Sequence, residues 1–146
     1  MQPIEDKIVK NMDNKKAHHK WEQGIIHLLN LDGWNLEWTG ENFSHYDAKG
    51  KTPKGYDCVI EFKLRDKYYP TKILEHYKYS KLMQEPNCMK FYYVFDCKGN
   101  YLYHLDTLKL PELEIKKLQN NNIDKQEKNK EVFMLSESQA SITNKY

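Results

Sequence analysis

The spacing of apolar residues predicts a helix near the start of the chain. In the segment 15–30, apolar side chains recur every three or four residues and form one stripe, which is typical of an amphipathic helix. The stripe consists of Ala17, Trp21, Ile25, Leu28 and Leu29. Residues 3–12 are expected to add a turn or two of helix. Asp32-Gly33 ends the pattern, and residues 34–38 predict a short strand.

A strand, a turn and a second strand are expected from residue 43 onward. The segment 49–55 is rich in Gly, Pro and Lys, which predicts a hairpin loop with Lys54 at its midpoint. Residues 56–64 have a nearly continuous apolar middle, as expected of an interior strand that is covered on both faces.

The second half of the chain adds a helix and further strands. A helix is expected from Pro70 to Gln84, because proline is favoured in a first helical turn. Residues 89–96 and 101–105 read as strands joined by a turn at 98–100.

The C-terminal third is expected to be less regular. A short helix is expected after Pro111, a mobile loop over 119–130, an edge strand over 131–135 and a frayed tail over 137–146. The whole pattern predicts one α/β domain over residues 1–146, with a single mixed sheet flanked by helices.

Composition narrows the class of protein. The chain has 146 residues, of which 39% are hydrophobic and 13% aromatic, which fits one folded domain and excludes a disordered chain. No apolar stretch approaches the roughly 20 residues of a spanning helix, so no membrane association is expected. Three cysteines cannot all pair with one another, and the start of the chain lacks an apolar signal, so an intracellular protein is expected.

The positive charge is concentrated in the middle of the chain. Residues 49–81 contain nine basic and four acidic residues, a net +5, while the chain as a whole carries +2. This concentration indicates a surface that binds a polyanion. An ordinary lysine-rich, solvated surface explains the charge equally well.

The segment around Glu61 carries the candidate chemistry. Glu61 and Lys63 are two residues apart on a strand, so both point to one face. A hairpin centred on Lys54 places Asp47 directly across from Glu61, with Cβ atoms about 4.5–5.5 Å apart. Two adjacent carboxylates repel unless a cation lies between them, and Mg²⁺ accepts one or two carboxylates with water and phosphate. Asp57 is the rival first acid, but it lies roughly 13 Å along the strand from Glu61.

These residues resemble the motif of the PD-(D/E)XK nuclease superfamily. Tyr46-Asp47, thirteen intervening residues and Glu61-Phe62-Lys63 match it, with Tyr46 in the place of the proline. The order of elements over residues 15–105 is similar to the superfamily's restriction-endonuclease-like αβββαβ core. The resemblance implies Mg²⁺-dependent DNA hydrolysis, with Mn²⁺ as a substitute. It makes Asp47 and Glu61 metal ligands, Lys63 the catalytic lysine and Glu22 an additional acid on the first helix.

Further basic residues are candidates for contacts with DNA. Arg65 lies on the face of Glu61 and Lys63, and its planar guanidinium suits a phosphate, although a pair with Asp66 or Glu75 is an equal alternative. The resemblance makes Lys78 a candidate phosphate contact. The remaining candidates lie on the predicted hairpin loop and read equally well as solvated: Lys49, Lys51 and Lys54.

These features together predict a metal-dependent DNA endonuclease. With few residues beyond the core, it is expected to recognise branched DNA or junctions and to act in recombination or repair, with a homodimer needed for paired cuts. By association with the superfamily, a phage or mobile element and the host cytoplasm would suit it. The alternatives are a restriction-type enzyme that reads a defined sequence and an inactive module that binds nucleic acid or protein.

Overall fold

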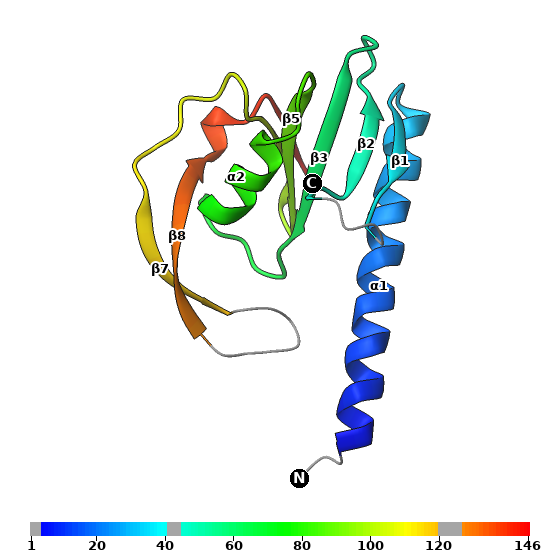
Figure 1. Cartoon of the computed structure of the whole chain (residues 1–146), viewed down its shortest axis with the longest axis vertical. Helices are drawn as coiled ribbons and strands as arrows, with labels where there is room; N and C mark the ends of the chain where they lie inside the picture. The colour runs from blue at the N-terminus through cyan, green and yellow to red at the C-terminus, as the bar shows by residue number, and fades with distance from the viewer. Residues whose placement is uncertain (1–3, 41–44, 120–126) are drawn as a thin grey trace.

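A computed structural model describes residues 4–40, 45–119 and 127–146 (Figure 1). The first half contains α1 (Ile4–Leu31), β1 (Asn35–Trp38), β2 (Ala48–Lys51), β3 (Asp57–Leu64), β4 (Thr71–Glu75) and α2 (His76–Met83). The second half contains β5 (Met89–Asp96), β6 (Gly99–His104), β7 (Glu114–Gln119), β8 (Glu127–Ser136), a 3-10 turn (Glu137–Gln139) and β9 (Ile142–Lys145). The segment 3–12, expected to add a turn or two, continues α1 from Ile4 without a break.

A mixed six-stranded sheet forms the centre of the protein. Its strand order is β1-β2-β3-β5-β6-β9, and β3 pairs in parallel with β5 while the other neighbours are antiparallel. The near-continuous apolar run of β3 suits its interior position, because side chains on both of its faces are buried. The predicted mixed α/β architecture is confirmed, although the structure contains a second sheet that the sequence pattern did not predict.

Each face of the central sheet packs against a separate layer. Trp21, Ile25 and Ile26 of α1 pack against one face, which Phe62 of β3 shares. The other face packs against α2 and the second sheet, through a cluster that includes Val59 on the central sheet. The contributions from the covering layer are Leu74, Leu82, Phe133 and Leu135. Glu61 and Lys63 therefore share the face of Val59, opposite Phe62, as the alternation along the strand predicts.

The β2–β3 hairpin has the predicted register. Ala48 pairs with Ile60 and Lys51 with Asp57, so the hairpin is centred on residue 54. The expected loop over 49–55 is too long, because residues 49–51 are paired on both sides within β2. Glycine at position 50 permits this pairing, since a Cβ there would overlap the backbone carbonyl of Asn35 on β1.

The prediction of a helix from Pro70 to Gln84 is wrong for its first residues. Residues 71–75 form β4, and α2 begins only at His76. Strand β4 pairs with β8, and Leu74 is buried against the central sheet. The apolar run at 73–74 suits a buried strand as well as a helix, and the partner strand that decides between them lies some 60 residues further along the chain.

Most predictions for the C-terminal third are also wrong. The expected helix after Pro111 is replaced by β7, and the expected edge strand over 131–135 is part of β8, which lies between β4 and β7. Residues 119 and 127–130 belong to strands, so the loop predicted over 119–130 is wrong at both ends, and residues 120–126 lie outside the described residues. The expected frayed tail forms the 3-10 turn and β9, which pairs with β6.

Within the described residues, no helix combines the length and the apolar character needed to cross a membrane. All three cysteines are free thiols: Cys58 is buried, Cys88 half-buried and Cys97 exposed.

Candidate active site

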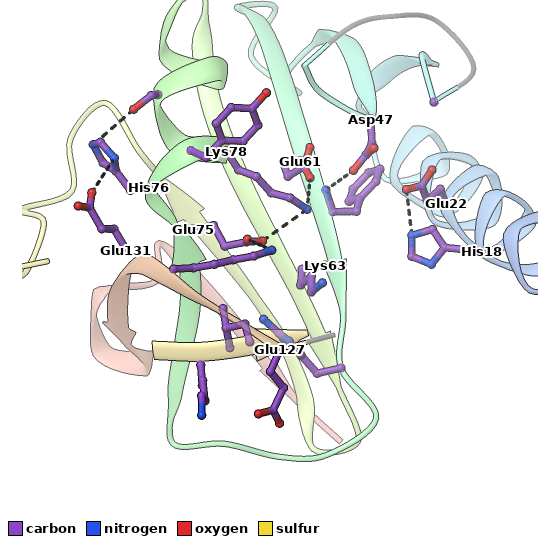
Figure 2. Close-up of a pocket in the computed structure, with 18 of the residues that line it drawn as sticks. His18, Glu22, Asp47, Glu61, Lys63, Glu75, His76, Lys78, Glu127 and Glu131 are labelled. Atoms are coloured by element: carbon purple, nitrogen blue, oxygen red, sulfur yellow. Dashed lines mark hydrogen bonds and ion pairs between the residues drawn. The ribbon is translucent and has the colours of Figure 1, made fainter. Parts of the chain in front are cut away.

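The β2–β3 hairpin brings Asp47 and Glu61 together. Asp47 directly precedes β2, and its backbone N–H donates to the carbonyl of Ile60 at 2.9 Å. Its side-chain Oδ2 accepts a hydrogen bond of 2.8 Å from the backbone N–H of Phe62, the residue after Glu61. Figure 2 shows the carboxylates of Asp47 and Glu61 beside each other at the edge of the hairpin. The backbone bond fixes the orientation of the Asp47 carboxylate relative to β3.

The electrostatic surroundings of Asp47 disfavour its charged form. Burial, and then the nearby carboxylates of Glu61 and Glu22, raise the pKa of Asp47 to about 8. Burial also raises the pKa of Glu61, against the opposing charge of Lys78. Without a further cation, these carboxylates cannot all carry a negative charge at low cost.

Lys78 on α2 partly compensates this negative charge. Its Nζ lies 3.5 Å from Oε1 of Glu61 and 4.0 Å from Oε2 of Glu75, so one ammonium spans two carboxylates (Figure 2). Burial lowers the pKa of Lys78, but the attraction of Glu61 and Glu75 outweighs burial and raises it overall. Lys130 of β8 supports Glu75 from the other side, with Nζ 2.8 Å from Oε1.

Lys63 lies on the same face as Glu61 but is held differently. Burial, followed by repulsion from Lys78 and Arg65, lowers the pKa of Lys63 to about 8. An amine with a pKa near neutrality can hold or release a proton under ordinary conditions. Lys63 thus lines the same groove as the two carboxylates, on the face of β3 that carries Glu61.

Glu22 approaches the site from α1. Its side chain is buried, with Oε1 accepting a 3.0 Å hydrogen bond from Nε1 of Trp38 and Oε2 lying 3.3 Å from Nε2 of His18. Burial raises its pKa, but the contacts with His18 and Trp38 outweigh burial and lower it. Both oxygens of Glu22 therefore have protein partners, and a role as metal ligand stays a prediction.

A groove with a volume of about 1230 Å³ is lined by the charged residues of the site: Glu22, Asp47, Glu61, Lys63, Glu75, Lys78 and Lys130. Its walls come from α1, Gly40, the β2–β3 hairpin with the flanking Asp47 and Arg65, β4, α2 and the β7–β8 hairpin. This volume exceeds the roughly 300–1000 Å³ that is usual for small-molecule sites. The groove suits an extended ligand better than a metabolite.

The structure brings some of the other predicted DNA contacts to the groove and leaves the rest outside it. Arg65 and Lys78 line the groove. Lys49 and Lys51 are exposed and pair with Glu85 (3.6 Å) and Asp57 (2.8 Å), and neither they nor the exposed Lys54 line it. The structure thus does not bring the three hairpin lysines to the groove, and Asp57, the rival first acid, lies with them.

Sequence reasoning missed the contribution of β4 and of the β7–β8 hairpin. Glu75, Lys130 and the groove residues Lys117, Glu127 and Glu131 were not assigned to the site, because their segments were predicted as helix, mobile loop or edge strand. The local signal for β8 is the apolar run 132–135, and the strand extends beyond the expected range to Glu127 and Ser136. Its pairing with β4 is a long-range contact that no local pattern indicates.

The carboxylates fit a hard divalent cation. Within the described residues, no three His, Cys, Asp or Glu side chains cluster closely enough to hold a metal by themselves. Mg²⁺ does not need such a cluster, because it binds through one or two carboxylates and completes its shell with water and phosphate oxygens. The mutual repulsion of Asp47 and Glu61 is what such a cation would relieve.

The central mixed sheet, the two covering layers and the hairpin site define a restriction-endonuclease-like fold. A solved structure with the same fold is Archaeoglobus fulgidus Hjc, a Holliday junction resolvase from an archaeal hyperthermophile. It matches with a TM-score of 0.55 and 13% sequence identity, over 84% of this chain and 93% of that chain. No protein-family model and no curated protein sequence matches the chain. The structural likeness at this low identity shows the fold alone.

Proposed function

We propose that this protein is a metal-dependent DNA endonuclease that cleaves branched DNA, with four-way junctions as the leading substrate. The observation that carries the proposal is that Asp47, Glu61 and Lys63 line one groove, which is larger than a typical small-molecule site. The resolvase activity named for Hjc, which has the same fold, supports the choice of substrate.

In this proposal Asp47 and Glu61 hold Mg²⁺, with Mn²⁺ as a substitute, and Glu22 adds negative charge beside them. A bound divalent cation would lower the pKa of a water ligand and neutralise charge on the phosphoryl oxygens. The hydrogen bond from the Phe62 N–H keeps Asp47 oriented toward the same point as Glu61. The chain itself thus prepares the position of the cation before substrate arrives.

The basic side chains act on the substrate. Lys63, with its pKa lowered to about 8, stabilises the charge that develops at the scissile phosphate and can exchange a proton there. Lys78 pairs with Glu61 in this structure, and its ammonium would be available to a phosphate oxygen if a cation took its place at Glu61. Arg65, which also lines the groove, binds a neighbouring phosphate through its planar guanidinium.

The groove supports recognition of DNA by shape. It is bounded on one side by α1 and on the other by the β7–β8 hairpin, and its floor carries the reacting residues. Paired cuts across a junction require two such sites, so the proposed active form is a homodimer. Recombination or repair inside a cell, including the cytoplasm of a phage-infected host, is the proposed setting.

One experiment tests the metal, the residues and the substrate together. The protein is incubated with a four-way junction, a linear duplex of the same arms and a plasmid, each with Mg²⁺, Mn²⁺ or EDTA. We expect cleavage of the junction with either metal, none with EDTA, and none by Glu61→Ala or Lys63→Ala. Cutting that persists in EDTA, or in both variants, would contradict the mechanism. Cutting at one duplex sequence would instead indicate a restriction-type enzyme, and absence of all cutting an inactive binding module.

A further inference from the structure

A second, smaller hollow adjoins the candidate active site. Its volume is about 220 Å³, and Asp47 and Glu61 form one side while Tyr77, Lys78 and Lys81 of α2 form another. All of these except Lys81 also line the large groove, so the two hollows meet at the carboxylates. A substrate bound at the carboxylates therefore has a separate space beside it, on the side of α2.

Tyr77 is exposed at the place where the two hollows meet. Its exposed fraction is 70%, so most of this residue is open to solvent. The opposite side of α2 secures the helix to the core, because Leu82 is buried and the ring of Tyr79 packs edge-on against Phe133 at 5.4 Å. The fold therefore does not depend on packing of the Tyr77 ring.

Lys81 completes an aromatic and basic face on α2. Residues four apart lie on the same side of a helix, and Nζ of Lys81 is 5.6 Å from the centroid of the Tyr77 ring. This distance is within the range of a cation–π contact, and it places the ammonium over a ring rather than against a carboxylate. Lys78, three residues before Lys81, directs its own ammonium toward Glu61. The face thus combines a stacking surface with the positive charge of Lys81.

We propose that the Tyr77–Lys81 face binds an unpaired nucleobase next to the scissile phosphate, with the base on the Tyr77 ring and Lys81 on the flanking phosphate. The inference rests on the proposed function, because it concerns the same site. The volume of the hollow equals roughly seven water molecules, which is the size of one base. Aromatic side chains stack on any base, so this subsite reads the absence of a partner strand and not the sequence.

This subsite explains a preference for branched DNA without a separate recognition domain. In a continuous duplex every base is stacked and paired, and an additional cost is needed to expose one. At a branch point bases open more easily, and stacking on Tyr77 recovers part of that cost. Cleavage would therefore occur beside the branch, where a base can enter the hollow.

The test measures base stacking without cleavage. A four-way junction carries the fluorescent base 2-aminopurine next to the branch point and is titrated with the whole protein in EDTA, beside a linear duplex labelled at the same position. We expect quenching of the junction probe by the wild-type protein and by Tyr77→Phe. Tyr77→Ala should lose the quenching and weaken junction binding by about 5- to 150-fold, while its duplex binding changes little.

Tyr56→Ala serves as the matched control, because Tyr56 is also an exposed tyrosine (55%) but lines neither hollow. It should quench and bind as the wild type does, and circular dichroism should show that all variants are folded. Quenching and junction affinity that survive in Tyr77→Ala, or that fall equally with the duplex, would overturn the inference. Failure of the proposed function would appear separately, as stacking by a wild-type protein that does not cleave with Mg²⁺.

Discussion

The protein contains two sets of charged side chains within the fold that are organised in opposite ways. One is the groove set of Asp47, Glu61, Lys63 and Lys78. The other, which we call the Lys72 cluster, joins Lys72 of β4 to Asp96 at the end of β5 and to Glu137 of the 3-10 turn. The comparison between them separates charges that serve the fold from charges that are available for chemistry.

In the Lys72 cluster every charge has its partners. The buried Nζ of Lys72 donates to Oδ2 of Asp96 at 2.9 Å, to the carbonyl of Tyr69 at 2.6 Å and to Glu137 at 3.4 Å. The other oxygen of Asp96 accepts the backbone N–H groups of residues 98 and 99. The rings of Tyr68 and Tyr101 lie 4.4 Å and 4.1 Å from the same ammonium. Such complete pairing of the charges offsets the cost of their burial.

In the groove set the pairing is incomplete. Asp47 accepts one backbone hydrogen bond, and its pKa rises to about 8 because it is buried beside other carboxylates. The pKa of Lys63 falls to about 8 because it is buried beside other cations. Shifts of this kind, in a groove, are typical of functional sites. Burial of charged side chains alone therefore does not indicate a binding site. Burial combined with repulsion between like charges that have no complete set of partners does indicate a candidate site.

The largest expected effect on stability is in the Lys72 cluster. Lys72→Met keeps most of the side-chain volume but leaves the charge of Asp96 buried without its ammonium. We expect the free energy of unfolding to fall by about 3–5 kcal/mol, measured by urea denaturation. Lys98→Met, which removes an exposed lysine over the ring of Tyr68, is the control and should change little. A small loss of unfolding free energy in Lys72→Met would contradict this difference between the two sets of charges.

The same kind of change in the groove should affect activity and spare the fold. Asp47→Asn keeps an oxygen that accepts the Phe62 N–H but removes a repelled negative charge. We expect Mg²⁺-dependent cleavage to fall by about 10²–10³-fold, a loss similar to that of one transition-state contact. The urea midpoint without metal should stay the same or rise. A drop in stability comparable with that of Lys72→Met would contradict the contrast.

The two sets should respond to pH in opposite directions. Because the pKa of Asp47 in the folded protein is raised from 3.8 to about 8, the folded state holds the proton more tightly, and its stability in EDTA should fall as pH rises through this window. Hydrogen bonds from Lys145 and then Tyr68 lower the pKa of Glu137 from 4.5 to about 2, so its contribution is present above pH 4.5 and is lost as pH falls toward 2. Urea midpoints measured across pH for wild type, Asp47→Asn and Glu137→Gln check both signs. Asp47→Asn should remove only the loss of stability at rising pH, and Glu137→Gln only the loss of stability at falling pH.

The smallest expected effect concerns Lys78, whose ammonium lies between the carboxylates of Glu61 and Glu75. Lys78→Met removes the cation that competes for Glu61, so the Mg²⁺ concentration for half-maximal cleavage should fall. The maximal rate should fall about tenfold, because the substrate loses a phosphate contact and Glu61 its orientation. Lys78→Arg should restore part of the rate. An unchanged rate and an unchanged metal requirement would place Lys78 outside the mechanism.

Much of the candidate site could be predicted from local sequence. The alternation along β3 determined that Glu61 and Lys63 share a face, and the Gly- and Pro-rich turn determined the register that brings Asp47 across from Glu61. A two-strand hairpin needs only neighbouring residues, so its geometry follows from the period of two and the position of the turn. The first helix was predictable because its apolar stripe is also a local pattern. The fold class followed from the order of the predicted elements.

The opposite wall of the groove was decided only by tertiary structure. Residues 71–75 form a strand because β8 pairs with them, and the predicted frayed tail is ordered because β6 offers an open edge and Glu137 pairs with Lys72 and Lys145. These partners are distant in the chain, and no local periodicity encodes a pairing over such a separation. The sequence by itself therefore determined the hairpin that carries the candidate site. The enclosed groove, and the burial that shifts the pKa values within it, arise only when distant strands meet.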